Sequence, residues 1–404
     1  MAELTFSDLS FEKDPDGIKV NFLRIFHSRI KEEDLLGIGK YRISGKSIDF
    51  EGVSETKASR KFNGLLSKSF ENLRNRVSNK PTVYIHRNMG IPLIGTNYFG
   101  VIDRGTNTLE VKPLTSCNIS CIFCSVDEGP GSRRRVDYVV EKDYLVEEFR
   151  KVVAFKGADD IDAHINAQGE PTLYADLIPL IRDIMATPGV KTSSIDTNGT
   201  LLNPKFIDEL ADAGLTRLHL SLHAIDQEMA NKLAGFPYNV KRVMEMARYA
   251  CTKMDLIITP VWLCGYNDQE LPKLAKFAQD IGAGKNCPPV GIQNFLPYRM
   301  GRNPVKTVAF EEFFKRMREL EKEHNITLLH TKGFNMHKVK ELPKPFRKNE
   351  VVEAEIRLPG RIGNEKLAVA RGRMISIPQC EKSSGKAMVR IRRTKHNIFS
   401  AELV

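Results

Sequence analysis

Three closely spaced cysteines are the residues of this chain best suited to chemistry. Cys117, Cys121 and Cys124 form the pattern C-x3-C-x2-C, and Phe123 precedes the third cysteine. A disulfide fits poorly, because nothing in the sequence indicates an oxidising compartment. A single zinc ion needs a fourth ligand, and the next cysteine along the chain is Cys251. Three thiolates without a local fourth ligand suit a cubane iron–sulfur cluster whose remaining iron is open.

This cysteine loop resembles the cluster-binding loop of the radical S-adenosylmethionine (SAM) superfamily. The resemblance implies a [4Fe–4S] cluster on Cys117, Cys121 and Cys124, with SAM bound to the open iron through its amino and carboxylate groups. It also implies reductive cleavage of SAM to a 5′-deoxyadenosyl radical. The electron would come from a donor such as ferredoxin or flavodoxin.

The elements that must position this loop alternate between strand and helix. The predicted strands are 109–113, 161–165, 192–196, 216–221, 256–262 and 290–295. The predicted helices are 140–155, 175–185, 204–213, 240–250, 269–281 and 310–323. Such alternation favours an α/β fold with a parallel sheet covered by helices. Six units are too few for a closed eight-stranded barrel, and they resemble the partial (β/α)6 barrel of radical SAM enzymes, with the chemistry at the C-terminal strand ends.

Polar segments follow several of these strands and resemble the cofactor pocket of the superfamily. Gly169-Glu170-Pro171 follows the second strand and resembles the segment that binds the SAM amino group. Ser221, at the end of the fourth strand, resembles a residue that contacts the ribose or carboxylate of SAM. The cofactor-binding residues that the resemblance implies are Phe123, Gly169, Glu170, Pro171, Thr197, Asn198, Ser221 and Asn294.

Two further side chains are candidates for catalysis. His223 follows the fourth strand, and both a structural and a catalytic histidine remain open for it. Cys264 follows the fifth strand, where a thiol could donate a hydrogen atom or form a covalent bond. The competing interpretation is that Cys264 packs beneath the turn at Gly265. The roles of Cys251, Cys287 and Cys380 stay open, although free cysteines are commonly buried and inert.

The C-terminal region is basic and has a different pattern. Residues 347–404 hold thirteen lysines and arginines against six acidic residues, in a chain of net charge +11. Alternating segments at 351–357, 367–377, 386–393 and 398–404 predict a small OB-like β-barrel. Pro359-Gly360-Arg361 and Ala370-Arg371-Gly372-Arg373 resemble a TRAM domain, which implies RNA binding. The alternative is a basic structural cap, with Phe399 in the barrel core.

An arginine run, Arg133 to Arg135, lies just after the cysteine loop and suits a phosphate-rich substrate, although a solvated basic turn is equally open. His396 could stack on bases. The predicted RNA-binding residues are Arg133, Arg134, Arg135, Arg361, Arg371, Arg373, Arg392, Lys395 and His396.

The chain of 404 residues is long enough for several domains. We expect an N-terminal α+β extension at 1–104, the partial barrel at 105–335 and the TRAM-like barrel at 347–404. The acidic N-terminus is no signal peptide, and the longest apolar stretch, 256–263, is too short to span a bilayer. These features predict a cytoplasmic protein without a membrane partner.

The combined interpretation is a radical SAM enzyme that modifies structured RNA, either tRNA or rRNA, by methylation or another C–H functionalisation. The alternative is a radical SAM enzyme of small-molecule cofactor biosynthesis or of protein modification. Methylthiotransferases that combine radical SAM and TRAM domains carry a second cluster on N-terminal cysteines. This chain has no cysteine before Cys117 and departs from that pattern.

Overall fold

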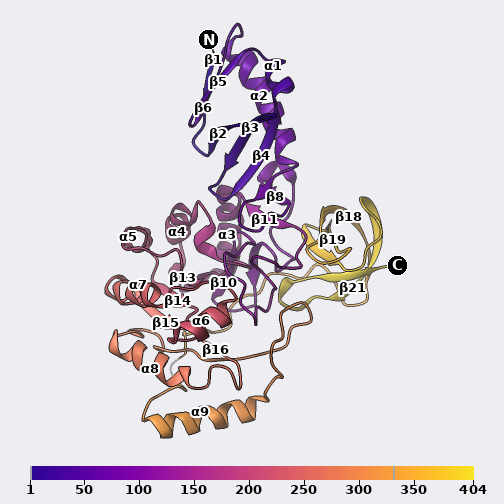
Figure 1. Cartoon of the computed structure of the whole chain (residues 1–404). Coiled ribbons are helices and arrows are strands. Elements are labelled where there is room, and N and C mark those ends of the chain that lie inside the picture. The colour runs from indigo at the N-terminus through magenta and orange to yellow at the C-terminus, as the bar shows by residue number, and fades with distance from the viewer. Residues whose placement is uncertain (1, 331–332) are drawn as a thin grey trace.

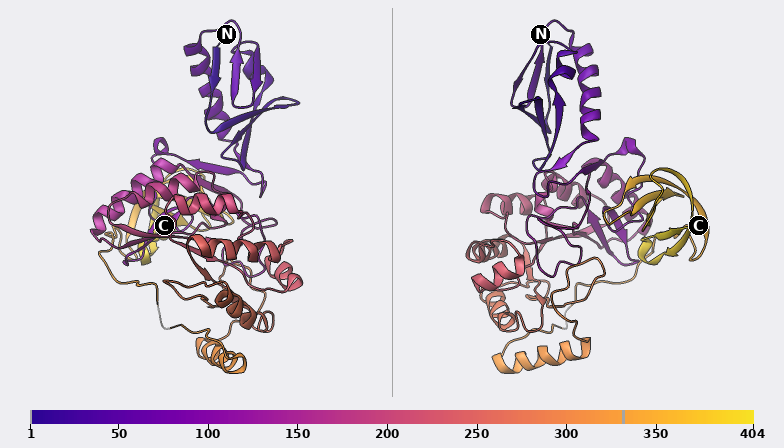
Figure 2. Two further views of the ribbon diagram at one scale, coloured as in Figure 1. Left: turned by 90° about the vertical axis from the view of Figure 1, so that its left-hand side faces the viewer. Right: turned by 45° about the vertical axis from the view of Figure 1, so that its right-hand side comes forward.

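The computed structural model describes residues 2–330 and 333–404. The predicted ranges 1–104 and 105–335 include the remaining positions, which lie outside the described residues. An N-terminal α+β region projects from the rest of the molecule (Figure 1, Figure 2). Its helix α2, with Phe62 buried, packs on two antiparallel sheets. The elements of this region are β1 (Ala2–Thr5), β2 (Leu9–Asp14), β3 (Gly17–Phe22), β4 (Phe26–Lys31), α1 (Glu32–Leu36), β5 (Tyr41–Ser44), β6 (Ser47–Phe50), α2 (Glu55–Phe70) and β7 (Arg74–Asn75).

A six-stranded sheet forms the centre of the molecule, in the order β15-β14-β13-β12-β10-β9. Its strands are β9 (Gly100–Asp103), β10 (Thr108–Lys112), β12 (Ile161–Ile165), β13 (Val190–Thr197), β14 (Arg217–Leu220) and β15 (Asp255–Ile258). All neighbours are parallel except β9, which runs antiparallel to β10 and precedes the boundary expected at 104. The mixed α/β partial barrel predicted from the sequence is therefore confirmed.

Helices follow the strands and cover one side of the sheet (Figure 1). They are α3 (Lys142–Lys156), α4 (Leu177–Met185), α5 (Pro204–Asp212), α7 (Val240–Lys253) and α8 (Glu270–Asp280), and α9 (Phe310–His324) lies beyond α8. In α5, Asn203 caps the first turn by accepting a hydrogen bond from the Phe206 amide, and Pro204 occupies the first helical position. Within the described residues, no helix combines the length and the apolar character that crossing a bilayer requires.

The strand predicted at 256–262 is interrupted at Pro260, which has no amide hydrogen for the ladder. The chain continues as β16 (Val261–Trp262), which pairs with β17 (Gln293–Asn294) in a separate two-stranded parallel sheet. A single parallel bridge between Ile258 and Val290 connects the two sheets. Of the sixth predicted strand, 290–295, Gln293 and Asn294 form a strand in the structure.

Two elements beside the cysteine loop are among those that were not predicted. Strand β11 (Asp137–Val140) pairs in parallel with β8 (Thr82–Ile85), which joins the N-terminal region to the barrel. Helix α6 (Gln227–Ala234) lies in the connection between β14 and α7. Asp226 caps α6 through the Met229 amide. Both additions border the cysteine loop.

The C-terminal region is a closed barrel in the order β18-β19-β20-β22-β21. Its strands are β18 (Val351–Pro359), β19 (Lys366–Ala370), β20 (Arg373–Ile377), β21 (Gly385–Arg393) and β22 (Ser400–Leu403). The predicted strand at 367–377 is a hairpin, because Arg371 and Gly372 both adopt positive φ (46° and 68°). The barrel has a hydrophobic core separate from that of the rest of the molecule, and Phe399 is fully buried in it. The Phe399 amide donates to the Gly95 carbonyl at 2.8 Å.

Candidate cofactor-binding site

The cysteine loop leaves the C-terminal end of β10 and is held by helix α6. The Ser120 amide donates to the Ala234 carbonyl at 2.9 Å, and the Ile122 amide donates to the Leu233 carbonyl at 3.0 Å. The last carbonyls of a helix have no intrahelical partner, so the loop satisfies two of them. Gly235 ends α6 with a φ of 57°, and a Cβ there would lie 2.3 Å from the Ser120 carbonyl oxygen. The close approach of helix and loop therefore requires glycine.

Arg302 holds the other side of the loop. Its guanidinium donates to the Cys121 carbonyl at 3.1 Å and to the Glu128 carbonyl at 3.0 Å, and its Nε lies 2.7 Å from an Asp127 oxygen. Burial alone would raise the pKa of Asp127, but hydrogen bonds from Arg133 and Arg302 outweigh it and lower the pKa. An ionised carboxylate and a guanidinium therefore fix the loop after the third cysteine.

The three thiols are half-buried at the end of β10. Burial raises the pKa of Cys121 to about 12. Among the described residues, the group whose ligand atoms all lie within 4.8 Å of one another is His164, Asp196 and His219, and the cysteines form no such group. Thiolates on different irons of a cubane stand farther apart than thiolates on one ion. The three cysteines therefore fit an iron–sulfur cluster better than a single zinc ion.

Glu170 joins the ends of β12 and β13 beside the cysteine loop. Its buried carboxylate accepts hydrogen bonds from the Thr197 hydroxyl at 2.7 Å and the Asn198 amide at 2.7 Å, and also from the Thr172 hydroxyl and amide. Burial raises the pKa of this carboxyl, while these donors oppose the shift. These four hydrogen bonds occupy the lone pairs of the Glu170 carboxylate. In this structure, Glu170 thus positions the neighbouring strand ends.

Gly169 and Asn198 bring these strand ends against the cysteine loop. A Cβ on Gly169 would lie 1.9 Å from the Ser116 carbonyl oxygen, so only glycine allows the close contact. The side-chain nitrogen Nδ2 of Asn198 lies 4.0 Å from Cys117 Sγ and donates to Asn118 Oδ1 at 2.9 Å. The structure thus brings Gly169 and Asn198 close to the first cysteine.

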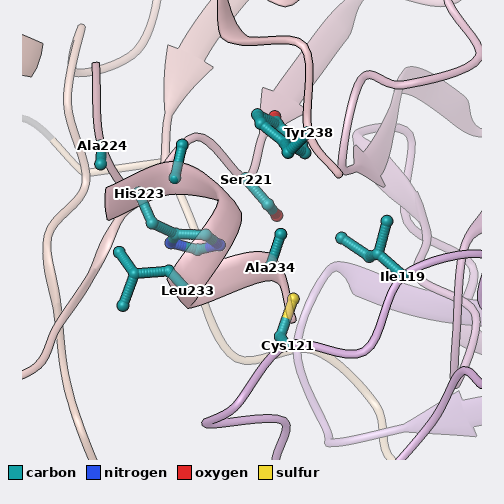
Figure 3. Close-up of a pocket in the computed structure, with 9 residues that line it drawn as sticks. Ile119, Cys121, Ser221, His223, Ala224, Leu233, Ala234 and Tyr238 are labelled. Atoms are coloured by element: carbon teal, nitrogen blue, oxygen red, sulfur yellow. The ribbon is translucent and has the colours of Figure 1, made fainter. Parts of the chain in front are cut away.

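A pocket lies between the cysteine loop, α6 and the end of β14. Figure 3 shows Cys121, Ser221 and His223 around it, with the Ser221 hydroxyl directed inward. Its lining residues are Ile119, Cys121, Ser221, His223, Ala224, Ala230, Leu233, Ala234 and Tyr238. Tyr238 donates from its hydroxyl to the Asn198 carbonyl at 2.7 Å, which connects the pocket to the end of β13. The predicted residues Ser221 and His223 therefore share a pocket with a cluster cysteine.

His223 is held as a neutral imidazole. Its Nδ1 accepts a hydrogen bond from the Val261 amide at 3.1 Å, and its ring contacts Phe123 edge-to-face at 4.7 Å. Burial lowers the pKa of His223 to about 4. The neutral ring therefore carries its hydrogen on Nε2.

Of the predicted catalytic and cofactor-binding residues, Ser221 and His223 line this pocket, and Asn294 and Cys264 are among those that do not. Asn294 donates to the Val308 carbonyl at 2.8 Å and holds a loop. Cys264 is exposed. Partial desolvation of its thiol raises its pKa, and the negative charge of Asp268 raises it further. The other charges that influence the Cys264 thiol belong to Arg316 and Glu312 on α9.

Two of the predicted RNA-binding residues are buried, which corrects the prediction for them. Arg361 is fully buried and pairs with Glu128 and Asp137, and Arg134 is 6% exposed and donates to the Val126 carbonyl at 2.6 Å. Their guanidinium groups stabilise the fold because carbonyls and carboxylates of the protein already surround them. Arg373 and His396 are half-buried, and the predicted residues that remain exposed are Arg133, Arg135, Arg371, Arg392 and Lys395.

Sequence reasoning missed Arg302, Gly235 and Arg361 as the residues that hold the cysteine loop. Arg302 lies 175 positions after Asp127, and Arg361 lies 233 positions after Glu128. A single sequence carries no local signal for contacts at such separations. The Gly301-Arg302 pair after the sixth strand was the one available indication, because glycine often marks a close backbone approach. A Cβ on Gly301 would lie 2.9 Å from the Cys124 carbonyl oxygen.

Comparison with known proteins gives consistent results. Residues 111–278 match a family model described as the radical SAM superfamily. An uncharacterised protein of Methanocaldococcus jannaschii is 40% identical over 361 residues, which cover 82% of this chain and 83% of that protein. A probable GTP 3′,8-cyclase of Pyrococcus abyssi is 25% identical over 63% of this chain and 76% of its own length.

The solved structures have lower sequence identity to this chain. SuiB of Streptococcus suis bound to S-adenosylmethionine superposes with a TM-score of 0.43 at 15% identity, over 80% of this chain and 71% of that one. TYW1 with a lysine–pyruvate adduct superposes with a TM-score of 0.38 at 17% identity, over 54% of this chain and 73% of that one.

Proposed function

Since this chain belongs to the radical SAM superfamily, we propose that it uses its cofactors to modify a structured RNA, either tRNA or rRNA. The cofactors are SAM and a [4Fe–4S] cluster, as in the members of that superfamily. A reduced donor such as ferredoxin or flavodoxin supplies the electron. The reaction on the RNA is a methylation or another C–H functionalisation.

In this proposal, Cys117, Cys121 and Cys124 hold the cluster, and the strand ends around it bind SAM. The bound cofactors together supply a 5′-deoxyadenosyl radical for hydrogen abstraction. The chain orients the cluster loop through α6 and Arg302 and shields it from water by the apolar lining of the pocket. The Ser221 hydroxyl and the Asn198 side chain provide polar groups at this site.

The single observation that carries the RNA proposal is that a basic barrel packs directly on the cysteine loop. The barrel side chain Arg361 reaches Glu128, which is four residues beyond the third cysteine. Exposed Arg392, Arg393 and Lys395 lie on the same barrel. A basic domain that packs on a catalytic centre favours a polyanionic substrate. The resemblance to a TRAM domain supports the same substrate.

The RNA proposal is tested by binding measured over a range of salt concentrations. Replacement of Arg392, Arg393 and Lys395 by glutamate should weaken binding of transfer RNA and reduce the dependence of affinity on salt, because fewer counterions are released. The matched control reverses Lys40, Lys57 and Arg60, which are exposed on the N-terminal region. Equal affinity and equal salt dependence in both variants would contradict the assignment.

A second candidate function is radical chemistry on a purine nucleotide. It is favoured by the names of several relatives, including GTP 3′,8-cyclases of Pyrococcus abyssi and Aquifex aeolicus. Mass spectrometry of RNA nucleosides from a deletion strain separates the two candidates. Loss of a modified nucleoside supports the RNA substrate. An unchanged nucleoside profile, together with turnover of free GTP by the purified enzyme, supports the second candidate.

A further inference from the structure

The inner face of the central sheet is unusually polar for a barrel. Barrel interiors are normally packed by branched apolar side chains. Here Glu110 and His164 occupy paired positions on β10 and β12, and Asp196 and His219 occupy paired positions on β13 and β14. Buried Lys112 pairs with Glu110 at 3.2 Å. A charged layer of this kind needs compensation, either from its own ion pairs or from a ligand.

Three of these side chains converge on one point. His164 Nε2 lies 3.3 Å from Asp196 Oδ2, and His219 Nδ1 lies 3.2 Å from Asp196 Oδ1. One ligand atom from each residue falls within 4.8 Å of the other two, the spacing expected around a single metal ion. Because the three residues come from adjacent strands, the backbone ladder fixes their relative positions. The arrangement therefore does not depend on flexible loops.

The surroundings orient two of these groups. The second ring nitrogen of His164 lies 2.9 Å from the Ser194 hydroxyl, the kind of contact that fixes the ring and tautomer of a metal-ligating histidine. Phe334 packs on His219 with ring centroids 5.6 Å apart, and the Arg217 guanidinium lies over the Phe334 ring, 5.2 Å from its centroid. Among the described residues, the buried Nε2 of His219 has no hydrogen-bond partner.

We propose that His164, Asp196 and His219 bind a divalent first-row metal ion, such as Zn²⁺ or Fe²⁺, inside the partial barrel. Two imidazole nitrogens and one carboxylate oxygen are a ligand set that both ions accept, and three protein ligands leave positions open. An oxygen atom of the substrate, from a phosphate or a carbonyl group, is the ligand class suited to an open position. The thiols of the cysteine loop are separate from this set.

Asp196 links the metal site to the cysteine loop through the chain. It is followed by Thr197, which donates to Glu170, and by Asn198, which contacts Cys117. An ion on Asp196 is thus held on the strand whose end borders the proposed cluster. The competing explanation is a histidine–aspartate–histidine ion-pair network that only stabilises the sheet.

The experiment measures zinc uptake by the full-length protein with its cluster reconstituted. After incubation with Zn²⁺ and desalting, we expect one zinc ion per chain besides the iron of the cluster. Asp196→Asn and His219→Gln should each weaken zinc binding by at least about tenfold, by analogy with losses at supporting metal-site residues. The control His324→Gln changes an exposed histidine on α9 and should bind zinc as the wild type does.

Retained iron in the Asp196 and His219 variants shows that the fold survives. Zinc-edge X-ray absorption of the wild type gives a second measurement that needs no variant, and it should show nitrogen scattering from two imidazoles. Absence of zinc in the wild type, equal zinc in the wild type and both variants, or sulfur-only ligation would each overturn the proposal.

Discussion

The Arg361 guanidinium donates to carboxylates of both Glu128 and Asp137, and all three side chains are buried. Arg361 belongs to the C-terminal barrel, Glu128 to the cysteine loop and Asp137 to β11. Burial would lower the pKa of Arg361, but Glu128 outweighs that effect and raises the pKa, so the guanidinium stays charged. A buried charge with two carboxylate partners couples the barrel mechanically to the loop. Removal of Arg361 leaves two buried carboxylates without their counter-ion.

Arg361→Met tests this coupling. We expect the free energy of unfolding to fall by about 3–5 kcal/mol, because two buried carboxylates lose their counter-ion. The iron content after reconstitution should also fall, because Glu128 lies on the cysteine loop. Urea unfolding and iron determination measure the two effects. Arg392→Met, which breaks an exposed pair with Glu402, is the control and should change both quantities far less. Similar losses in the two variants would contradict the coupling.

Arg302→Ala addresses the opposite side of the same loop. The variant removes donors to the Cys121 and Glu128 carbonyls and the ion pair with Asp127. We expect the fold to persist while the reconstituted protein loses iron faster to a chelator. Circular dichroism and timed iron release give the measurement. Arg299→Ala alters a neighbouring exposed arginine and serves as the control. Iron release at the wild-type rate would show that Arg302 does not hold the loop.

The sequence was sufficient for the elements whose pattern is local. Strand β12 was predicted with its observed bounds, 161–165, because its apolar residues are bounded by polar ones. The break at Pro260 was missed, because the apolar residues on both sides of Thr259 and Pro260 were interpreted as one strand. The hairpin at Arg371 was missed for a related reason, since a non-glycine residue with a φ of 46° gives little signal.

The sequence likewise predicted the parts of the candidate site that belong to short motifs and missed those that depend on distant contacts. Cys117, Gly169 and Asn198 belong to short motifs, and the structure places them together. Arg134 and Arg361 were predicted on charge alone, but burial depends on contacts that are distant in the sequence. A buried arginine with carboxylate partners and a solvated arginine on a surface have the same letter in the sequence. Their distinction required the packed structure.

Gly235→Ala tests the contact between α6 and the cysteine loop. The left-handed backbone alone should cost about 1–2 kcal/mol, and the added Cβ would displace the Ser120 carbonyl. We therefore expect lower stability and less iron per chain. Gly64→Ala is a matched control, because Gly64 lies within α2 and a Cβ there meets no atom within 4 Å. That control should gain about 0.5–1 kcal/mol. An unchanged iron content in Gly235→Ala would show that the loop does not need this contact.

An assay of SAM cleavage tests the three proposed cluster ligands. Alanine in place of Cys117, Cys121 or Cys124 should abolish formation of 5′-deoxyadenosine, because each thiol is one of three ligands in the proposed cluster. The control Cys380→Ala alters a cysteine buried in the C-terminal barrel and should cleave SAM normally. Full cleavage in any of the three cluster variants would remove that cysteine from the proposed ligand set.

Cys264→Ala decides the role of the remaining exposed thiol. Cys264 lies on the turn after β16, with Asp268 and the α9 residues Glu312 and Arg316 as its charged neighbours, and it is not among the residues that line the pocket at Cys121. We therefore expect the variant to cleave SAM and to modify RNA at wild-type rates. Parallel assays of 5′-deoxyadenosine and of modified nucleoside give the measurement. A variant that cleaves SAM but yields no modified RNA would instead assign Cys264 to the transfer step, because a thiol that donates a hydrogen atom or a covalent bond acts only after cleavage.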